Sequence, residues 1–349
     1  MTSTSNPGIL LIGNFLSRTL GTRCVCEDLA ERLDSTGWFR VLTTSGKAGR
    51  VSRLLDMMFT VWRRQSEYGV AQVDVYSGPA FIWAEIVCRN LRLRGKKYIL
   101  TLHGGNLPQF GEKHPERVKR LLNSAAVVTT PSHYLLEQMR GYRADLKLLP
   151  NPLDLGAYEF RLRERQAPRL MWLRAFHTIY NPQLAARVLG RLSAEWPEAH
   201  LTMVGPDKNE GSMAELKRVA AELGVTARID LPGPVPKSDV PQWMERGDIF
   251  LNTTNVDNAP VSVIEAMACG LCVVNTSVGG IPYLLKDGHD ALLVPPDDPE
   301  AMVAAVKRIL TEPGLAAKLS RNARAKAEQF DWSVVLPQWE TLFRTLLKS

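Results

Sequence analysis

The chain has 349 residues, which is enough for two domains of ordinary size rather than one small core. Hydrophobic residues make up 45% and charged residues 23%, and no apolar run approaches the roughly 18 residues that a transmembrane helix needs. The net charge is +7, and residues 1–150 carry 21 Lys+Arg against 12 Asp+Glu, or +9, whereas the rest carries 22 against 24, or −2. This asymmetry indicates an anionic partner of the first half: nucleic acid, a membrane surface or a phosphorylated acceptor.

The N-terminus and the cysteines indicate a cytoplasmic protein. The first seven residues are polar and uncharged and lack the basic start and apolar core of a signal peptide. Five cysteines, an odd number, do not suggest a disulfide framework. Cys269 and Cys272 form one C-x-x-C without the second pair that zinc would need. We interpret both as small apolar residues around a helix end and the next strand, with a redox pair as the alternative.

From the N-terminus, short apolar runs alternate with helical patterns, which is typical of βαβ units and parallel sheets. The first run precedes a helical pattern over residues 20–34, with Cys24, Leu29 and Leu33 on its inward face. The first half therefore predicts one doubly wound sheet. Its strands are expected at Ile9–Gly13, Val41–Thr44, Val73–Tyr76, Tyr98–Leu102, Val127–Thr130 and Lys147–Leu149.

The alternation breaks around residues 150–168, where three prolines bracket Arg161-Leu-Arg-Glu-Arg165, and this composition predicts a linker. It then restarts and predicts a second doubly wound domain, followed by a mostly helical end. Two such α/β, Rossmann-like domains facing a cleft would bind ligands at the carboxyl ends of their strands. The strands of the second domain are expected at Leu170–Leu173, Leu201–Val204, Ile229–Leu231, Ile249–Asn252 and Cys272–Asn275.

The most informative stretch is Asp257-Asn-Ala-Pro-Val-Ser-Val-Ile-Glu265-Ala-Met-Ala-Cys-Gly270, which predicts a loop, a helix and a tight turn. Pro260 fits a first helical turn and Gly270 fits a helix end. The free N–H groups at the start of such a helix favour a phosphate. Glu265 could accept two hydroxyl hydrogen bonds, as from a ribose, or could simply be favoured there by the helix dipole.

This stretch resembles the E-x7-E motif of family 4 glycosyltransferases, which have the GT-B fold and retain anomeric configuration. The resemblance continues in Ser277-Val-Gly-Gly-Ile-Pro282 and in Lys286-Asp-Gly-His-Asp-Ala-Leu-Leu-Val-Pro295, and Pro150-Asn-Pro-Leu-Asp154 resembles the family's interdomain segment. It implies an acceptor-side Rossmann-like domain at residues 1–152 and a nucleotide-sugar-binding one at 165–328. Residues 329–349 would form a final helix that crosses back to the first domain.

The resemblance also implies site residues. Glu265 would bind the ribose hydroxyls of the donor, Asp257 would contact the transferred sugar, and the backbone of Gly233 to Val235 would border the nucleobase. Asp257 stands where the family has Glu, so the identity of the donor sugar stays open. The expected catalytic residues are His103, Arg174 and Asp257. The expected donor-binding residues are Gly21, Arg174, Tyr180, Gly233, Val235, Asp257, Asn258, Ala259, Val261 and Glu265.

Arg174, at the end of a predicted strand, is a candidate for the donor diphosphate. The leaving group gains negative charge as the glycosidic bond breaks, so a guanidinium fork stabilises the transition state more than the ground state. The family usually has a Lys five or six residues later, where this chain has Ile179 and Tyr180. Tyr180, a backbone amide or another cation would substitute, or the activity would be weak; a solvated surface Arg174 is the alternative.

In the first half, the loop ending in Gly21 lacks the G-x-G-x-x-G pattern, which argues against dinucleotide binding. It resembles the family's glycine loop near the donor phosphates. His103 precedes Gly104 and Gly105 at a strand end, and by resemblance it contacts the donor sugar; a structural histidine is the alternative. No D-x-D motif occurs, so we expect neither a metal nor another cofactor.

The segment Arg50–Arg64 is apolar in its middle and basic at both ends, and a second basic group spans Arg89 to Lys97. The segment Arg50–Arg64 predicts either a membrane-surface helix or a core helix with solvated ends. An anionic membrane surface is thus a candidate partner, with the protein peripheral on its inner face, and nucleic acid is not expected. One helical face would carry Leu54, Leu55, Met58, Val61 and Trp62.

Together these features predict a retaining transferase that moves a sugar from a nucleotide-sugar to a glycan or lipid-linked acceptor, in cell-surface polysaccharide or glycolipid synthesis. The diphosphate held by Arg174 would accept the acceptor's proton in a front-side displacement. One alternative is another GT-B enzyme, such as a nucleotide-sugar epimerase or a phosphorylase. The other is a catalytically weak nucleotide-binding partner of an active transferase.

Overall fold

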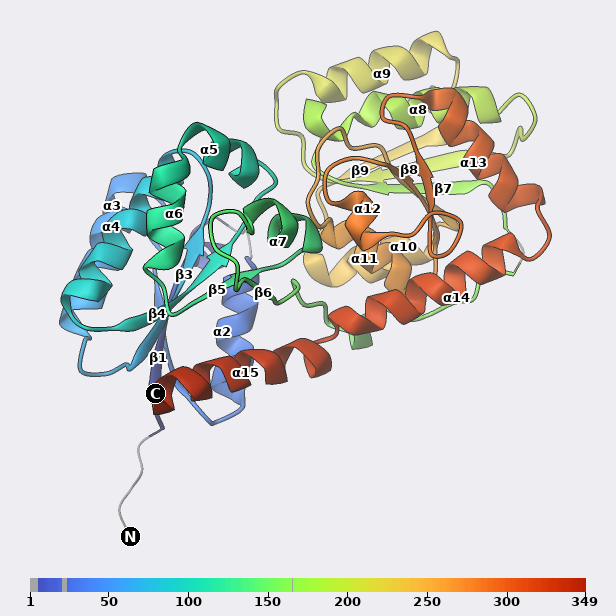
Figure 1. Ribbon diagram of the computed structural model, residues 1–349. Coiled ribbons are helices and arrows are strands. Elements are labelled where there is room, and N and C mark those ends of the chain that lie inside the picture. Colours follow the sequence, from blue (N-terminus) through green and yellow to red (C-terminus); the bar gives the residue numbers. More distant parts are fainter. Residues whose placement is uncertain (1–5, 21–23, 165) are drawn as a thin grey trace. The chain divides into compact units, whose positions relative to one another are not determined.

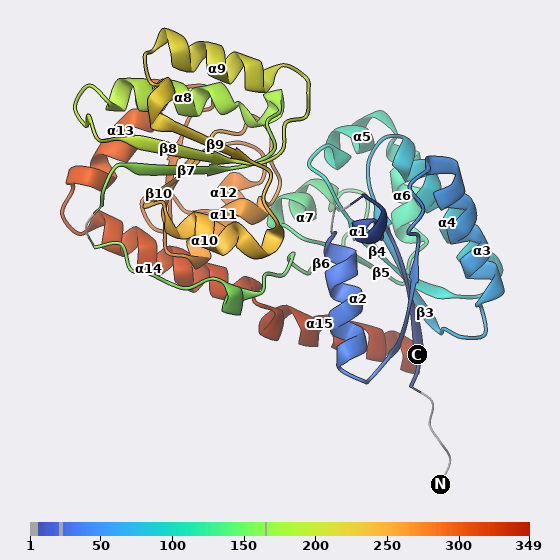
Figure 2. The same cartoon turned by 180° about the vertical axis from the view of Figure 1, so that it is seen from behind.

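The computed structural model describes residues 6–20, 24–164 and 166–349, and the chain divides into two compact units. Unit 1 comprises residues 1–152 and 333–349, and unit 2 comprises residues 153–332 (Figures 1 and 2). The chain therefore passes from unit 1 to unit 2 after Pro152 and returns after Trp332, so that the last helix packs in the unit that contains the N-terminus.

Unit 1 is built on a sheet of six parallel strands in the order β2-β1-β3-β4-β5-β6. Its central strands are buried on both faces, which explains their Val, Ile and Leu content. The strands are β1 Gly8–Ile12, β2 Arg40–Thr44, β3 Val70–Val75, β4 Lys97–Leu102, β5 Val127–Thr130 and β6 Lys147–Leu148. The helices are α1 Ser17–Leu20, α2 Val25–Ser35, α3 Arg50–Arg63, α4 Pro79–Leu93, α5 Leu107–Lys113, α6 Pro115–Asn123, α7 His133–Met139 and α15 Trp332–Lys348.

Strand β3 begins at Val70, three residues before the strand that the sequence predicts. The polar Gln72 interrupts the apolar run, but its amide donates to Asp74 Oδ1 and to Thr101 Oγ1, each at 2.8 Å. These bonds compensate for burying the amide group, so a polar residue is tolerated inside the sheet. On the sheet, α3 and α4 lie side by side (Figures 1 and 2), and the Asn90 amide donates to the Met58 carbonyl at 3.2 Å.

Unit 2 contains a second sheet of six parallel strands, in the order β12-β11-β10-β7-β8-β9. The strands are β7 Arg169–Leu173, β8 His200–Val204, β9 Ile229–Gly233, β10 Ile249–Asn252, β11 Cys272–Thr276 and β12 Leu292–Val294. The α-helices are α8 Pro182–Leu192, α9 Ser212–Glu222, α10 Val240–Glu245, α11 Val261–Ala268, α12 Ile281–Leu284, α13 Pro299–Thr311 and α14 Leu315–Ala327. Short 3₁₀ turns are η1 Leu155–Ala157, η2 Thr178–Tyr180, η3 Thr226–Arg228, η4 Lys237–Asp239 and η5 Glu328–Phe330.

Each sheet has a point at which the strand order reverses. In unit 1 the chain leaves β1 for β2 and then returns to β3, on the other side of β1. In unit 2 it leaves β7 for β8 and β9 and then returns to β10, which pairs with β7 on the opposite edge. Loops diverge at such a reversal and leave room for a ligand at the carboxyl ends of the two strands.

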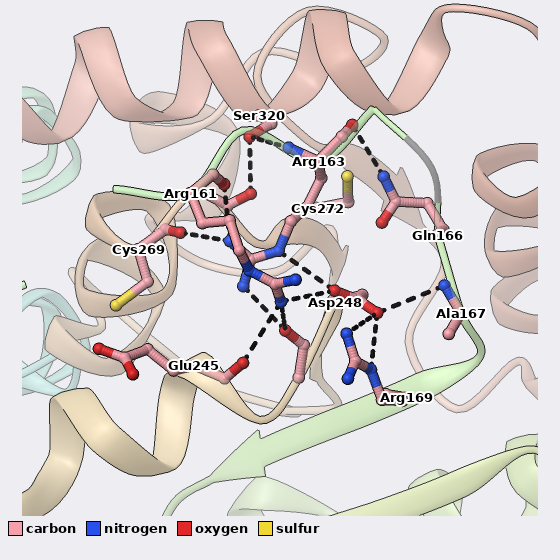
Figure 3. A network of polar contacts seen from close by, with 12 residues as sticks. Arg161, Arg163, Gln166, Ala167, Arg169, Glu245, Asp248, Cys269, Cys272 and Ser320 are labelled. Atoms are coloured by element: carbon pink, nitrogen blue, oxygen red, sulfur yellow. Dashed lines mark hydrogen bonds and ion pairs between the residues drawn. The ribbon is translucent and has the colours of Figure 1, made fainter. Parts of the chain in front are cut away.

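The Arg-rich stretch predicted as a linker is instead part of unit 2. Arg163 is only 1% exposed, and its guanidinium donates to the carbonyls of Arg161, Gly247 and Cys269. The buried carboxylate of Asp248 binds the guanidinium groups of three arginines (Figure 3). These are Arg161, Arg163 and Arg169. Burial lowers the pKa of Arg163 to about 10, so the side chain stays charged at neutral pH.

The C-x-x-C residues are buried, as the apolar interpretation predicts. Cys269 ends α11 and Cys272 begins β11, and both thiols are free. Burial raises the pKa of each thiol to about 12, so the reactive thiolate is disfavoured at neutral pH.

Candidate donor site and a cavity in unit 1

Arg174 and Asp257 meet at the strand reversal of unit 2. Arg174 follows β7 and Asp257 lies in the loop after β10, and these two strands are hydrogen-bonded neighbours. The Arg174 guanidinium forms an ion pair with the Asp257 carboxylate, and both side chains are largely buried. Burial raises the pKa of Asp257 above its usual range, while the nearby Arg174 charge and the Asn258 N–H oppose that rise. The structure therefore brings two of the three expected catalytic residues, Arg174 and Asp257, next to each other.

Tyr180 lies against Arg174, and it is one of the two residues, Ile179 and Tyr180, at the positions where the resembled family usually has a lysine. The Arg174 guanidinium carbon is 4.7 Å from the centroid of the Tyr180 ring, a cation–π distance. Around it, Thr253 Oγ1 donates to the Tyr180 carbonyl at 2.7 Å and receives a bond from the Trp172 indole at 2.9 Å. Among the described residues, the Nε of Arg174 has no hydrogen-bond partner. The aromatic ring thus restricts the orientation of the guanidinium.

Two glycines let the loop that carries Asp257 pack closely. A Cβ on Gly279 would lie 2.2 Å from the Asp257 carbonyl oxygen, and one on Gly280 would lie 1.9 Å from the Asn258 carbonyl oxygen. The Gly280 N–H donates to the Asp257 carbonyl at 2.9 Å. Gly205 similarly admits the Arg174 backbone, because its Cβ would lie 1.8 Å from that carbonyl oxygen. These turns fix the backbone at both ends of the ion pair.

Glu265 is buried in α11 rather than open to solvent. Its Oε1 accepts a hydrogen bond from the Tyr158 hydroxyl at 2.7 Å and pairs with the ammonium of Lys237. Glu265 is 2% exposed, whereas Lys237, in η4, is 60% exposed. Burial and the Glu265 charge raise the pKa of Tyr158 above its usual value, which keeps the hydroxyl a donor. Sequence reasoning missed both partners, and the ribose role of Glu265 stays a prediction.

The remaining expected donor residues lie on two loops of unit 2. Asn258 and Ala259 are half-buried between Asp257 and α11, and Val261 is the first residue of that helix. Pro260 is the N-cap and not a first-turn residue. Gly233 has a φ of +83°, and Val235, two residues before Lys237, packs against the core of unit 2. Gly21 lies outside the described residues.

His103 lies in unit 1, at the carboxyl end of β4. Its Nε2 is 2.9 Å from Asp74 Oδ1, and its ring stacks on Tyr76 with centroids 4.9 Å apart. The His103 N–H donates to the Val75 carbonyl at 2.8 Å. The histidine is thus oriented by a carboxylate and an aromatic ring, and its contact with the donor sugar stays a prediction.

A cavity of about 360 Å³ opens at the strand reversal of unit 1. The ends of β1 and β3 form its floor, and α3 and α4 form two walls. Arg53, which is buried, donates to Asn14 Oδ1 at 2.8 Å and to the carbonyls of Lys47 and Ala48. Among its lining residues are Asn14, Arg50, Arg53, Asp74, Tyr76 and Trp83. The cavity therefore combines aromatic, cationic and hydrogen-bonding groups.

The exposed face of α3 differs from the face that the sequence predicted. Val61 is fully buried, and Leu54 and Met58 pack against the core of unit 1. Of the expected set, Leu55 and Trp62 are exposed. The prediction that these five residues share one helical face was therefore wrong, because α3 is apolar on two faces and only one of them packs on the sheet. The alternative of a core helix describes the buried face.

Two further observations concern membrane-spanning helices and groups of metal-binding side chains. Within the described ranges, no helix combines the length and apolar character that crossing a membrane requires. Among the described residues, no group of three or more His, Cys, Asp or Glu side chains could hold a metal ion.

Comparison with known proteins identifies the class. Over 98% of this chain and 99% of the other, the structure matches sucrose-phosphate synthase from Thermosynechococcus elongatus, with a TM-score of 0.79 at 18% identity. It also matches Anabaena Alr3699/HepE in complex with UDP and glucose, with a TM-score of 0.73 at 16% identity, over 97% of this chain and 100% of that one. These matches confirm the GT-B fold.

Sequence comparison assigns the second unit more narrowly. Residues 167–312, within unit 2, match the family model described as glycosyl transferases group 1. A D-inositol 3-phosphate glycosyltransferase of Streptomyces bingchenggensis is 28% identical over 193 residues, or 54% of this chain and 40% of the relative. A second such enzyme, from Catenulispora acidiphila, is 29% identical over 247 residues, or 63% and 57%. The matched segments thus span about half of these relatives' lengths.

Proposed function

We propose that the protein is a retaining glycosyltransferase that moves a sugar from a nucleotide-sugar donor to a glycan or lipid-linked acceptor. The observation that carries the proposal is the ion pair of Arg174 with Asp257 at the strand reversal of a group 1 glycosyltransferase domain. In this proposal the Arg174 guanidinium binds the donor diphosphate, and the Asp257 carboxylate beside it binds sugar hydroxyls. The structural neighbour HepE is described in complex with UDP-glucose, which supports a UDP-sugar as the donor.

In the proposed reaction the bond between the anomeric carbon and the diphosphate oxygen breaks, and its electron pair stays on the diphosphate. The acceptor oxygen bonds to the anomeric carbon from the same face, and its proton passes to the leaving diphosphate. Arg174 stabilises the charge that develops on that group, because its guanidinium is oriented by Tyr180 before the reaction starts. The reaction as proposed uses no metal.

The cavity of unit 1 is the proposed site for the polar part of the acceptor. It lies at the strand reversal, where ligands of doubly wound sheets bind, and its volume suits one or two sugar rings. Arg50 and Arg53 favour an acceptor that carries negative charge. Such an acceptor fits cell-surface polysaccharide or glycolipid synthesis at the inner face of a membrane, with the protein cytoplasmic and peripheral.

The proposal is tested by thermal shift with UDP-, GDP-, ADP- and dTDP-sugars. We expect one nucleotide class to raise the melting temperature of the wild type, and Arg174→Ala to abolish that rise. Arg218→Ala is the matched control, because Arg218 is an exposed arginine of α9 paired only with surface carboxylates. If no nucleotide-sugar shifts the wild type, or if both variants lose the shift equally, the proposal fails.

Turnover separates the transferase from its alternatives. Transfer to an acceptor extract with retention of configuration, followed by NMR, supports the proposal. Conversion of the donor without any acceptor would indicate an epimerase instead. Donor binding without turnover would indicate a nucleotide-binding partner of another transferase, and the absence of a lysine at positions 179 and 180 offers a reason for that outcome.

A further inference from the structure

Helices α3 and α4 present a continuous apolar surface on the outside of unit 1. Four apolar side chains recur on one face of α3 at helical spacing, and three more recur on the outward face of α4, which packs beside α3. We call these seven residues the outer face. They are Val51, Leu55, Phe59 and Trp62 on α3 and Ile82, Ile86 and Leu93 on α4, with exposures from 36% to 76%.

The charges around the outer face have one sign. Arg50, Arg63, Arg89 and Arg92 are all exposed on these two helices. The two acidic side chains on the same helices are directed elsewhere, because Asp56 accepts from the Thr44 hydroxyl and Glu85 pairs with Arg117 of α6. The face therefore offers apolar groups with a cationic edge.

We propose that the outer face docks on an anionic lipid surface, so that α3 and α4 lie in the plane of the membrane interface. This combination of bulky apolar groups, aromatic rings and arginines is the pattern of interfacial helices. The rings of Phe59 and Trp62 are in tilted contact with centroids 5.9 Å apart, and the Arg63 guanidinium carbon lies 5.8 Å from the Phe59 ring centroid. That arrangement lets Arg63 reach the headgroups while its stem covers the rings. The arginines give the edge of the outer face a positive charge, which a layer of anionic lipid headgroups complements.

The same two helices also wall the cavity of unit 1 with their other sides. Docking of the outer face would hold that cavity at the lipid surface, within reach of a sugar attached to a lipid carrier. The role of the outer face in bringing the cavity to a lipid-linked sugar rests on the proposed function. The docking itself can be measured without any sugar transfer.

The test is co-flotation of the full chain with vesicles of phosphatidylcholine alone and vesicles that also contain phosphatidylglycerol. We expect binding to the anionic vesicles at low salt, and weaker binding at high salt. Leu55→Ser combined with Phe59→Ser should lower the partition coefficient about tenfold or more. Arg63→Gln and Arg89→Gln should lower it about fivefold each. Leu223→Ser, which changes an exposed leucine of unit 2, is the control and should bind as the wild type does.

Several outcomes would overturn the proposal. They are absence of binding to anionic vesicles, equal binding to neutral vesicles, full competition by inorganic phosphate, and equal loss in Leu223→Ser. A concentration-dependent dimer that Leu55→Ser and Phe59→Ser disperse, without vesicle binding, would make the outer face a protein interface instead. The melting temperature of each variant shows whether it is folded. Donor-induced thermal shifts are measured in parallel. Vesicle binding without a donor-induced shift refutes the proposed transferase function but not the docking surface. A donor-induced shift without vesicle binding refutes only the docking surface.

Discussion

Replacing Tyr180 by Leu should weaken donor binding without removing any group that touches phosphate in the proposed complex. The ring lies 4.7 Å from the Arg174 guanidinium, whose side chain is only 15% exposed. A cation–π contact is worth about 0.5–1 kcal/mol at exposed sites and about 2 kcal/mol when desolvated. For this largely buried pair we expect about 1–2 kcal/mol, which is a rise of about 5- to 30-fold in the Kd for UDP. Isothermal titration calorimetry with UDP measures it.

Two further variants define the cause. Tyr180→Phe keeps the ring and should bind UDP as the wild type does. Trp196→Leu is the matched control, because Trp196 is a half-buried aromatic on the same core and contacts Lys307 rather than Arg174. Equal UDP affinity of Tyr180→Leu and the wild type would refute the orienting role. A loss in Tyr180→Phe as large as in Tyr180→Leu would instead assign the effect to the hydroxyl.

Three other predictions concern the same unit. Gly280→Ala should cost about 1–3 kcal/mol of stability and displace the donor loop, because its Cβ would lie 1.9 Å from the Asn258 carbonyl oxygen. Gly141→Ala in unit 1, where a Cβ would meet no atom within 4 Å, is the control and should change neither the melting temperature nor the UDP affinity. Arg163→Met should lower the free energy of unfolding in urea by about 1–3 kcal/mol, since it removes hydrogen-bond donors from the Gly247 and Cys269 carbonyls and one of the three arginines that bind Asp248; a loss under about 0.5 kcal/mol would contradict this. The pKa of Asp257 is raised in the folded state, so the contribution of Asp257 to stability falls as the pH rises from the ordinary pKa of 3.8 through the folded pKa. Asp257→Asn should therefore gain stability relative to the wild type as the pH rises across that window. A difference in stability that stays constant with pH would refute this prediction.

The parts of the site that the sequence predicted are those set by local order along the chain. Arg174 and Asp257 each follow a strand, and alternating strands and helices place both strand ends at one edge of a parallel sheet. The glycine pair 279–280 was recognised by resemblance, and the structure supplies its reason, which is the close approach of the Asp257 loop.

The missed features depend on contacts between distant residues. Tyr158 reaches Glu265 across 107 positions, and no local pattern near Tyr158 indicates that contact. Lys237 did carry a signal, because it directly follows the loop assigned to the nucleobase, and a cation there is near any carboxylate of that site. The burial of Arg163 requires Asp248, which lies 85 residues later, so a local count of prolines and charges gives the wrong result.

The three charged side chains of the proposed donor site pair with protein groups of opposite charge. Arg174 pairs with Asp257, and Glu265 pairs with Lys237 and Tyr158. Under the proposed function, donor binding is therefore an exchange: a diphosphate displaces a carboxylate from the guanidinium, and ribose hydroxyls displace an ammonium from Glu265. These pairs avoid unpaired buried charges, which would cost several kcal/mol. The free energy of donor binding then reflects only the difference between the contacts that the donor makes and the contacts that it replaces. Lys237→Ala should accordingly change UDP affinity, measured by calorimetry, far less than Arg174→Ala does, because Lys237 is 60% exposed and only competes with the ribose for Glu265, whereas Arg174 is the proposed partner of the diphosphate.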